Sequence, residues 1–183
     1  LSKRPCKSKF TRERLNTNDA KRRYGRGSFS AGERIFLMSK IAVVTDTNSG
    51  ITREEAKKLG VYLLPMPFIV DGTEYFEGVT CTYEHFFEML EAGAEVSTSQ
   101  PSPESLTAMW EEALATHDSV VHIPMSSALS GSCDTAKALA AEYNGRVCVV
   151  DNKRIAITQR ESVLDALTLA EKGLHAAEIC VQL

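Results

Sequence analysis

Two short stretches of the chain are rich in side-chain hydroxyls, and each directly precedes a predicted helix. Residues 97–103 read Ser-Thr-Ser-Gln-Pro-Ser-Pro, and residues 126–132 read Ser-Ser-Ala-Leu-Ser-Gly-Ser. The N-terminus of a helix carries unpaired N–H groups and a partial positive charge, so it attracts carboxylates and phosphates. Serine and threonine before a helix also act as simple caps. The occurrence of two such stretches favours a binding site for an anion over caps alone.

Short apolar runs alternate with helix-like segments from residue 38 onward, which predicts an α/β fold. Residues 40–46 form an apolar run of strand length, typical of a parallel strand that is covered on both faces. The alternation therefore predicts a mostly parallel sheet with helices on both faces. Further strands are expected at 61–70 (bent or at an edge, because of two prolines), 73–76, 120–123 and 146–151, and helices at 52–60, 103–116, 131–143 and 159–172.

Polar residues follow three of the predicted strands and should therefore lie at one edge of the sheet. In parallel sheets, ligands bind beyond the carboxyl ends of the strands. Asp46 and Thr47 follow the first strand, the second hydroxyl-rich stretch follows His122, and Asp151 follows the last strand. We expect Asp46 and Asp151 to cap helices or orient hydroxyls, and His122 to lie in the core.

Signatures of several enzyme and cofactor classes are missing. No glycine-rich phosphate loop of the G-x-G-x-x-G or G-x-x-x-x-G-K-[ST] type occurs. Ser130 lies in Ala-Leu-Ser-Gly-Ser, which lacks the first glycine of a nucleophile elbow. The 4 histidines show no metal-ligand spacing, so no metal or cofactor is expected. The sequence instead favours a hydroxyl-lined site for an amphipathic ligand with an acid head group, because residues 62–69 supply abundant apolar side chains.

The first 37 residues differ in composition from the rest of the chain. They carry 11 Lys and Arg against 3 Asp and Glu, whereas the remainder carries 10 against 21. Segments so basic and so poor in apolar residues rarely form a core. We expect residues 1–37 to be a basic disordered tail or sequence derived from upstream of a natural start at Met38. A nucleic-acid-binding arm at residues 21–26 is the functional alternative.

The cellular compartment is indicated by the cysteines and by the apolar runs. The 5 cysteines are scattered without a C-x-x-C pair, which is typical of free thiols in a reducing compartment. No run approaches the roughly 18 apolar residues that a membrane span requires, and no apolar segment of a signal peptide follows the basic residues. These features predict a cytoplasmic location.

A series of motifs, taken in chain order, matches a known family. From about residue 40 to residue 183 the chain resembles the DegV family, whose members include the fatty-acid-binding FakB-type subunits of bacterial fatty acid kinase. The two hydroxyl-rich motifs, in this order, are the most specific part of the resemblance. The motifs are I-A-V-V-T-D at 41–46, I-V-D-G-T-E-Y at 69–75, T-S-Q-P-S-P at 98–103, S-S-A-L-S-G-S at 126–132 and V-V-D-N-K at 149–153.

The resemblance implies the EDD fold and a role in lipid metabolism. Family members bury the acyl chain of a long-chain fatty acid between two domains, and a partner kinase phosphorylates the carboxylate with ATP. The chain would then be a non-catalytic bacterial subunit that presents its ligand. The implied partners are a long-chain fatty acid and the catalytic subunit of an ATP-dependent fatty acid kinase, with no nucleic acid; peripheral contact with a membrane is compatible with this role.

The resemblance also assigns residues to the carboxylate site. In the family, hydroxyls of the two motifs hold the carboxylate, which places Thr98 and either Ser127 or Ser130 on the head group. Hydroxyl and N–H donors bind a carboxylate without a fixed counter-charge and leave one oxygen free to attack. The implied ligand-binding residues are Thr98, Ser99, Ser127, Ser130 and Gly131, with Asp46, Thr47 and Ser126 in support.

The chain departs from the family pattern in three respects. Ala128 and Ser132 stand where the second motif usually has glycine and threonine, and a methyl group at 128 matters if that position needs a positive φ. Residues 153–160 lack the small, glycine-containing run of the family. Family members are also longer, so we expect a truncated C-terminal domain. The expected divisions are 1–37 (tail), 38–158 (DegV-like α/β lipid-binding domain) and 159–183 (start of the truncated domain).

Two other functions remain open from the sequence. The chain could be a small-molecule acyl or phosphoryl transferase that uses Ser127 or Ser130 as its nucleophile. It could also be a nucleic-acid-binding protein that uses the basic tail, in which case binding should depend on salt and vanish without residues 1–37.

Overall fold

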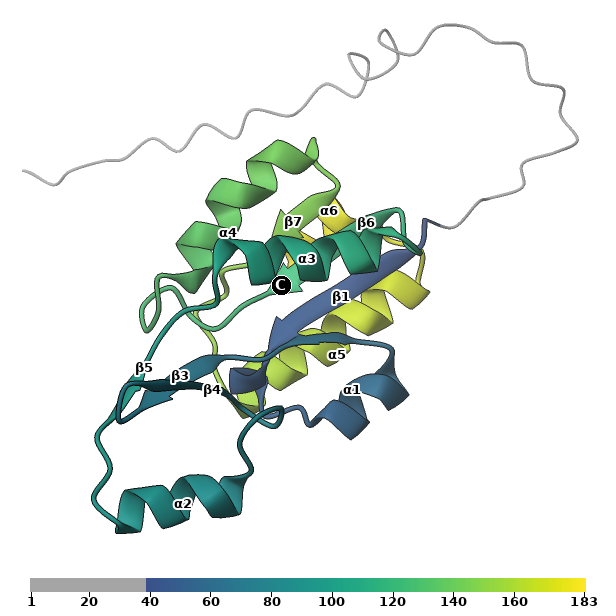
Figure 1. Cartoon of the computed structure of the whole chain (residues 1–183). Helices are drawn as coiled ribbons and strands as arrows, with labels where there is room; N and C mark the ends of the chain where they lie inside the picture. Colours follow the sequence, from purple (N-terminus) through teal and green to yellow (C-terminus); the bar gives the residue numbers. More distant parts are fainter. Residues whose placement is uncertain (1–38) are drawn as a thin grey trace, which may run out of the picture. The chain divides into compact units, whose positions relative to one another are not determined.

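Four parallel strands form the centre of the computed structural model, which describes residues 39–183 (Figure 1). Their order across the sheet is β2-β1-β6-β7. The strand β1 pairs with β2 on one side and with β6 on the other, so that Val44 lies opposite both Tyr62 and His122. The strands are β1 (Ile41–Asp46), β2 (Tyr62–Leu64), β6 (Ser119–Ile123) and β7 (Val147–Val149).

Successive residues of the central strands point to opposite faces of the sheet and build two cores. Val44 and Val120 belong to a core around Trp110, whereas Val43 and Val121 belong to a core on the other face. All of these side chains are almost completely buried. Burial on both faces explains why the strands read as continuous apolar runs.

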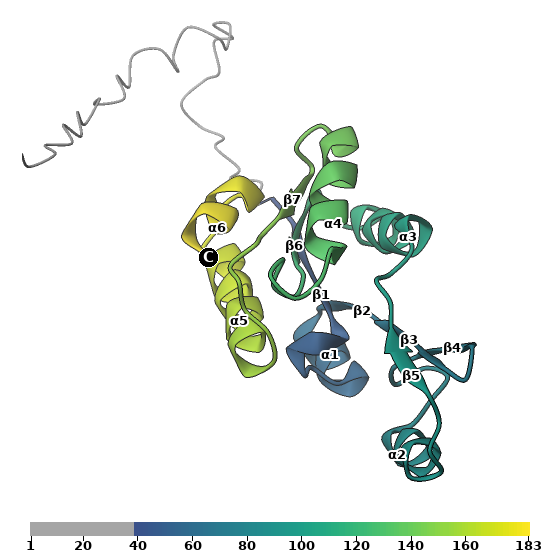
Figure 2. The ribbon, with the colours of Figure 1, turned by 90° about the vertical axis from the view of Figure 1, so that its left-hand side faces the viewer.

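Helices cover both faces of this sheet (Figure 2). The helices α3 (Pro103–Leu114) and α4 (Ser132–Ala140) pack on the face of the Trp110 core. The helices α1 (Arg53–Leu59), α5 (Ile157–Glu171) and α6 (Ala176–Gln182) pack on the opposite face. The predicted α/β class, with a mostly parallel sheet and helices on both faces, is confirmed.

Local sequence explains where the helices α1 and α3 begin. The Thr52 hydroxyl oxygen accepts a hydrogen bond from the Glu55 N–H at 3.2 Å and caps α1. The Ser102 hydroxyl oxygen accepts one from the Ser105 N–H at 3.1 Å and caps α3. Pro103 follows as the first residue of α3, where its missing N–H costs nothing. Both helix starts agree with the sequence prediction.

A second sheet of three antiparallel strands has the order β4-β3-β5. The apolar run at 61–70 breaks at Pro65 and Met66, so that β2 ends on the edge of the parallel sheet and β3 starts the second sheet. The predicted hairpin is confirmed, with Asp71 and Gly72 in its turn at φ 48° and 79°. The elements here are β3 (Pro67–Val70), β4 (Thr73–Phe76), α2 (Tyr83–Glu91) and β5 (Val96–Thr98).

The C-terminal helices belong to the same compact unit as the parallel sheet, and this unit includes all of the described residues, 39–183. The helix α5 begins at Ile157 and so crosses the boundary that the sequence placed between 158 and 159. Its Val163 lies in the same core as Val43 of β1, and Ile179 of α6 joins that core. These helices therefore complete one face of the sheet. The expectations for residues 1–37 concern a segment outside the described residues.

Candidate anion-binding site

The two hydroxyl-rich stretches line one open groove with a volume of about 420 Å³. Asn48, just after β1, and Met125, just after β6, also line it, so the groove lies beyond the carboxyl ends of the two central strands. The structure thus brings together the two stretches whose joint occurrence in the sequence favoured an anion-binding site. They contribute Thr98, Ser99 and Gln100 from the first stretch and Leu129, Ser130 and Gly131 from the second.

The first stretch begins in a strand, whereas the sequence indicated a loop. Thr98 is the last residue of β5 and pairs with Phe68 of β3. The Ser99 N–H continues this pairing and donates to the Pro67 carbonyl at 3.3 Å. The pairing partner lies about thirty residues away in the chain, so local pattern could not reveal the strand. Strand pairing holds the backbone of Thr98 and leaves its exposed side chain on the groove.

The second stretch forms a tight turn before α4. The N–H groups of Leu129 and Ser130 both donate to the Ser126 carbonyl, at 3.0 and 3.2 Å. The Ser130 hydroxyl oxygen accepts from the Ser132 N–H at 3.2 Å, so its own O–H can donate to a ligand. Gly131 occupies the N-cap of α4 without any side-chain cap bond. Ser130 thus satisfies the N–H of the first residue of α4, as a cap does, and its own O–H remains able to donate to a ligand.

Gln100 connects the two sides of the groove, a role that the sequence analysis missed. Its Oε1 accepts a hydrogen bond of 3.4 Å from the Thr135 hydroxyl of α4. The same oxygen lies 3.2 Å from the position that a Cβ would take at Gly131, so the glycine permits this close approach. Gln100 lies within the first motif, so its position in the sequence was a usable signal. Its contact with Thr135 depends on tertiary structure and could not be predicted.

Ser127 belongs to a charged cluster and is not among the residues that line the groove. Its hydroxyl oxygen accepts from Lys153 Nζ at 2.6 Å, and its N–H donates to Asp151 Oδ1 at 3.3 Å. Lys137 Nζ lies 3.1 Å from Asp151 Oδ2. Burial by itself raises the pKa of Asp151, but hydrogen bonds from Ser127 and Lys137 outweigh it and lower the pKa well below its usual range. Of the two candidate serines, Ser130 is the one on the groove.

Asp46 holds the ends of β1 and β6 together beneath the groove. Its carboxylate accepts from the Met125 N–H at 2.7 Å and from the Asn48 N–H at 3.0 Å. Gln159 of α5 also donates to it, at 3.1 Å. Asp46 is buried, and this burial raises the pKa of its carboxyl group. These contacts hold backbone beside the groove, and the expected supporting role of Asp46 in ligand binding stays a prediction.

Thr47 and Ser126 also stabilise backbone next to the groove. The Thr47 hydroxyl oxygen accepts from the Met66 N–H at 3.2 Å, at the point where β2 gives way to β3. The Ser126 hydroxyl oxygen accepts from the Ala128 N–H at 3.2 Å within the second stretch. Neither residue is among those that line the groove. Both can act on a ligand only through the backbone that they hold.

Backbone conformation shows that one departure from the expected family pattern causes no strain and that another one does. Ala128 is not among the described residues with positive φ, so its methyl group is accommodated without strain. Lys153 and Ala156 do have positive φ, 61° and 52°, in the run where the family has small residues. Glycine adopts such angles more easily than other residues. This turn contacts the second stretch through a 2.9 Å bond from the Ser126 N–H to the Arg154 carbonyl.

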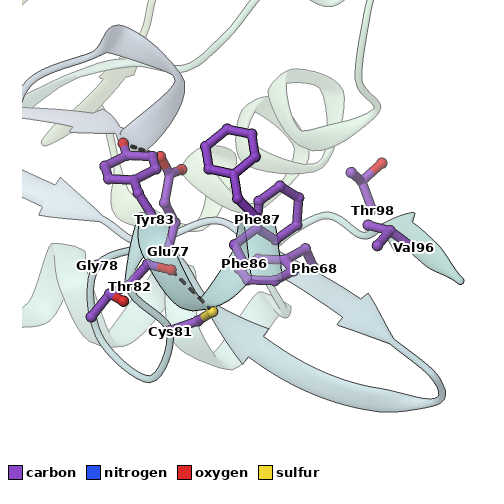
Figure 3. A pocket seen from close by; sticks show the side chains of 10 residues that line it. All are labelled: Phe68, Glu77, Gly78, Cys81, Thr82, Tyr83, Phe86, Phe87, Val96 and Thr98. Carbon is purple, nitrogen blue, oxygen red and sulfur yellow. Dashed lines mark hydrogen bonds between the residues drawn. The ribbon is translucent and has the colours of Figure 1, made fainter. Parts of the chain in front are cut away.

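An apolar cavity of about 250 Å³ adjoins the groove (Figure 3). Phe68, Glu77 and Thr98 line both spaces. Phe86, on α2, adds apolar surface to the cavity. Glu77 accepts a 2.7 Å hydrogen bond from the Tyr83 hydroxyl, which raises the pKa of Tyr83. The hydroxyl-lined groove therefore continues into apolar surface.

The groove is poor in charge. Among its lining residues, all within the described part of the chain, Glu77 is the only one with a charged side chain. Within residues 39–183, no cluster of His, Cys, Asp and Glu side chains is arranged to hold a metal ion. In the same range, no helix is long and apolar enough to cross a membrane. Hydroxyl groups, the carboxamides of Asn48 and Gln100, and backbone N–H groups are thus the donors that the groove offers.

A parallel α/β domain with a ligand groove at the carboxyl edge of its sheet is the class that the fold and site define. Residues 40–183 match the family described as "Uncharacterised protein, DegV family". The chain belongs to the DegV family, and the resemblance seen in its motifs is confirmed.

Relatives in this family include proteins with known ligands. A DegV domain-containing protein of Deinococcus radiodurans is 35% identical over 140 residues, which cover 76% of this chain and 50% of that protein. A fatty-acid-binding DegV family protein from Thermus thermophilus has a TM-score of 0.71 at 32% identity, over 78% of this chain and 51% of that one. DegV from Bacillus subtilis, a fatty acid binding protein, has a TM-score of 0.71 at 26% identity, over 79% and 52%. The chain thus spans about half the length of these relatives.

Proposed function

We propose that the chain binds a long-chain fatty acid, with the carboxylate in the groove, and presents it to a partner kinase in the bacterial cytoplasm for ATP-dependent formation of an acyl-phosphate. The observation that carries this proposal is that both hydroxyl-rich stretches converge on one groove next to apolar surface. Such a site matches a ligand with an acid head group and a hydrocarbon tail. The fatty-acid-binding relatives from Thermus thermophilus and Bacillus subtilis support the same ligand class.

The donors of the groove suit a carboxylate that must react later. Thr98 and Ser130 can each donate a hydroxyl hydrogen bond, and neither brings a fixed positive charge. A carboxylate held in a bidentate ion pair would have both oxygens tightly engaged. Neutral donors leave more electron density on an oxygen that is to attack a phosphoryl group. In this role the chain positions the substrate, and the partner kinase supplies ATP and the transfer chemistry.

The alternative function is acyl or phosphoryl transfer through a loop serine. A nucleophilic serine needs a neighbouring group that removes its proton. Lys153 donates a hydrogen bond to the Ser127 hydroxyl oxygen, and the backbone N–H of Ser132 donates to that of Ser130. Lys153 Nζ also forms an ion pair with Asp151 Oδ2 at 3.4 Å, and a backbone N–H cannot take up a proton, so neither contact serves as the base. The observed contacts therefore favour a binding role over a catalytic one.

Native mass spectrometry with organic extraction tests the proposal on protein purified from a bacterial host. We expect a long-chain fatty acid to accompany the wild-type chain and to be lost from the Thr98→Ala, Ser130→Ala double variant. Thr107→Ala is the matched control, because this half-buried threonine of α3 bonds only within its own helix, at 3.0 Å to the Pro103 carbonyl. Absence of lipid from the wild type, even after incubation with fatty acids, would refute fatty acid binding. Labelling of Ser127 or Ser130 by an acyl-phosphate analogue would then support transfer.

A further inference from the structure

A small cavity lies beneath the second hydroxyl-rich stretch and shares only Met66 with the lining of the groove. Its volume is about 10 Å³. Its polar lining comes from Asp46 at the end of β1, His122 of β6, and Ser132 and Thr135 of α4. The rest of the lining is apolar. Residues of β1, β6 and α4, which also position the groove, thus meet around this cavity.

Polar atoms around this cavity have no hydrogen-bond partner among the residues that the structure describes. His122 is 1% exposed, and both of its ring nitrogens are unpaired. Ser132 is 8% exposed, and its hydroxyl oxygen is also unpaired. Buried polar groups are almost always hydrogen-bonded, to protein or to ordered water. Two such side chains on one cavity therefore point to a shared partner inside it.

The volume of the cavity and the donors and acceptors that line it indicate what this partner is. A volume of about 10 Å³ is close to the smallest that holds one buried water, and such a water needs two to four polar neighbours. A neutral imidazole offers one donor and one acceptor, and a hydroxyl offers both. Water can donate and accept at once, so it matches this mixed set, whereas an organic ligand is too large. Trp110 packs edge-on against the imidazole, with ring centroids 5.6 Å apart.

We infer that the cavity binds one ordered water molecule that bridges the imidazole of His122 to the hydroxyl of Ser132. Through this water, His122 is a positioning residue for the second hydroxyl-rich stretch. The Ser132 N–H donates to the Ser130 hydroxyl oxygen at 3.2 Å, so whatever fixes Ser132 also fixes Ser130. The water thereby links β6 to the first turn of α4. Its effect on a ligand rests on the proposed function, whereas the water itself does not.

A high-resolution crystal structure of the full chain tests the inference without any ligand. We expect density for one water within hydrogen-bonding distance of a His122 ring nitrogen and of Ser132 Oγ. A cavity without such density, or a His122 ring that bonds directly to protein, overturns the inference. Because this readout does not depend on lipid, it stands or falls separately from fatty acid binding.

Paired substitutions test the positioning role. His122→Phe keeps an aromatic ring but removes both nitrogens, and Ser132→Ala removes the other end of the bridge. We expect each to weaken binding of a long-chain fatty acid several-fold, and the double variant to weaken it no more than the stronger single one, because both act on one water. His122→Gln retains an amide for the water and should recover part of the affinity. Val121→Ala is the control, since Val121 lies on the same strand but in the opposite core.

Additive losses in the double variant, or equal losses from His122→Phe and Val121→Ala, would contradict the positioning role. If His122→Phe does not fold, the comparison of Ser132→Ala with the control decides the question. A wild-type affinity in Ser132→Ala would then overturn the role of the bridge. A loss confined to Ser132→Ala, with the water absent from its crystal structure, would support it.

Discussion

Residues of the two motifs divide into those that face the groove and those that hold its backbone. Thr98 and Ser130 present hydroxyls to the groove, whereas Asp46 holds the backbone of Met125 beneath it. Ser127 bonds to Lys153 instead. In the proposed function, recognition of the carboxylate therefore rests on very few side chains, so single substitutions can test it.

Leu129→Asp should weaken the binding of a fatty acid about tenfold. Leu129 lines the groove and is 61% exposed, so the new carboxylate would lie beside that of the ligand and repel it. Leu129→Asn has nearly the same shape without the charge and should bind almost as the wild type does. Equilibrium titration with a long-chain fatty acid measures the difference. Equal affinities of the two variants would show that the carboxylate lies elsewhere.

His122 should make the fold sensitive to acid. Burial lowers the pKa of His122 from 6.5 to about 3, so the unfolded chain binds this proton more readily than the folded one does. The stability due to neutral His122 is thus fully present above pH 6.5 and is lost as the pH falls towards about 3. The loss should be on the order of a few kcal/mol.

Urea unfolding of the wild type and of His122→Phe between these pH values checks this prediction. Asp46 lines the same cavity, and its raised pKa acts in the opposite direction, because stability from its protonated form is lost as the pH rises. Asp46 is common to both proteins, so the difference between their pH profiles isolates His122. Parallel profiles would contradict the prediction.

At the scale of elements, the turn between β7 and α5 carries strain beside the second hydroxyl-rich stretch. Ala156 precedes α5 with φ 52° and ψ −132°, a conformation that is unfavourable for a residue with a side chain. Ala156→Gly should therefore raise the free energy of unfolding by about 1 kcal/mol. Chemical denaturation measures this change.

The control for this prediction is Ala108→Gly, at an exposed position inside α3. There the same exchange should lower the free energy of unfolding by about 1 kcal/mol, because glycine is a poor helix residue. Destabilisation by both substitutions would mean that Ala156 is not strained.

Elements with strong local signals were predictable, and those made by distant contacts were not. The buried strands β1 and β6 and the capped start of α3 follow from apolar runs, Ser102 and Pro103. The strand β5 was missed because its pairing with β3 is a tertiary event. The assignment of α5 to a second domain rested on the expected family layout, whereas Val163 packs into the first core.

The position of the candidate site could be predicted from the sheet topology, but its side-chain contacts could not. Parallel strands place the residues that follow them at one edge, which is why the second hydroxyl-rich stretch could be expected there, whereas the first stretch begins in β5 of the antiparallel sheet. The bridge through Gln100 and the separation of Ser127 from the groove depend on side-chain directions, which residue type and spacing do not determine. The sequence therefore could not show which residues of the two stretches face the groove and which ones hold its backbone.

At the scale of the whole molecule, charge is distributed unevenly along the chain. The first 37 residues carry 11 basic and 3 acidic residues, whereas the rest carries 10 and 21. We expect any binding to DNA to depend steeply on salt and to disappear when residues 1–37 are removed, because the remaining chain is acidic. Titration of labelled DNA at two salt concentrations checks this. Unchanged binding by residues 38–183 would instead place a nucleic-acid site on the α/β unit.

The most direct test of the account is to compare how the wild-type chain binds a long-chain fatty acid and the alcohol of the same chain length. Both have the same tail, so the comparison isolates the head group. We predict that the acid binds at least about tenfold more tightly, a difference of about 1.4 kcal/mol, and that Thr98→Ala with Ser130→Ala abolishes this preference. Equal binding of acid and alcohol by the wild type, or a preference that survives both substitutions, would contradict the claim that the two hydroxyl-rich stretches hold a carboxylate.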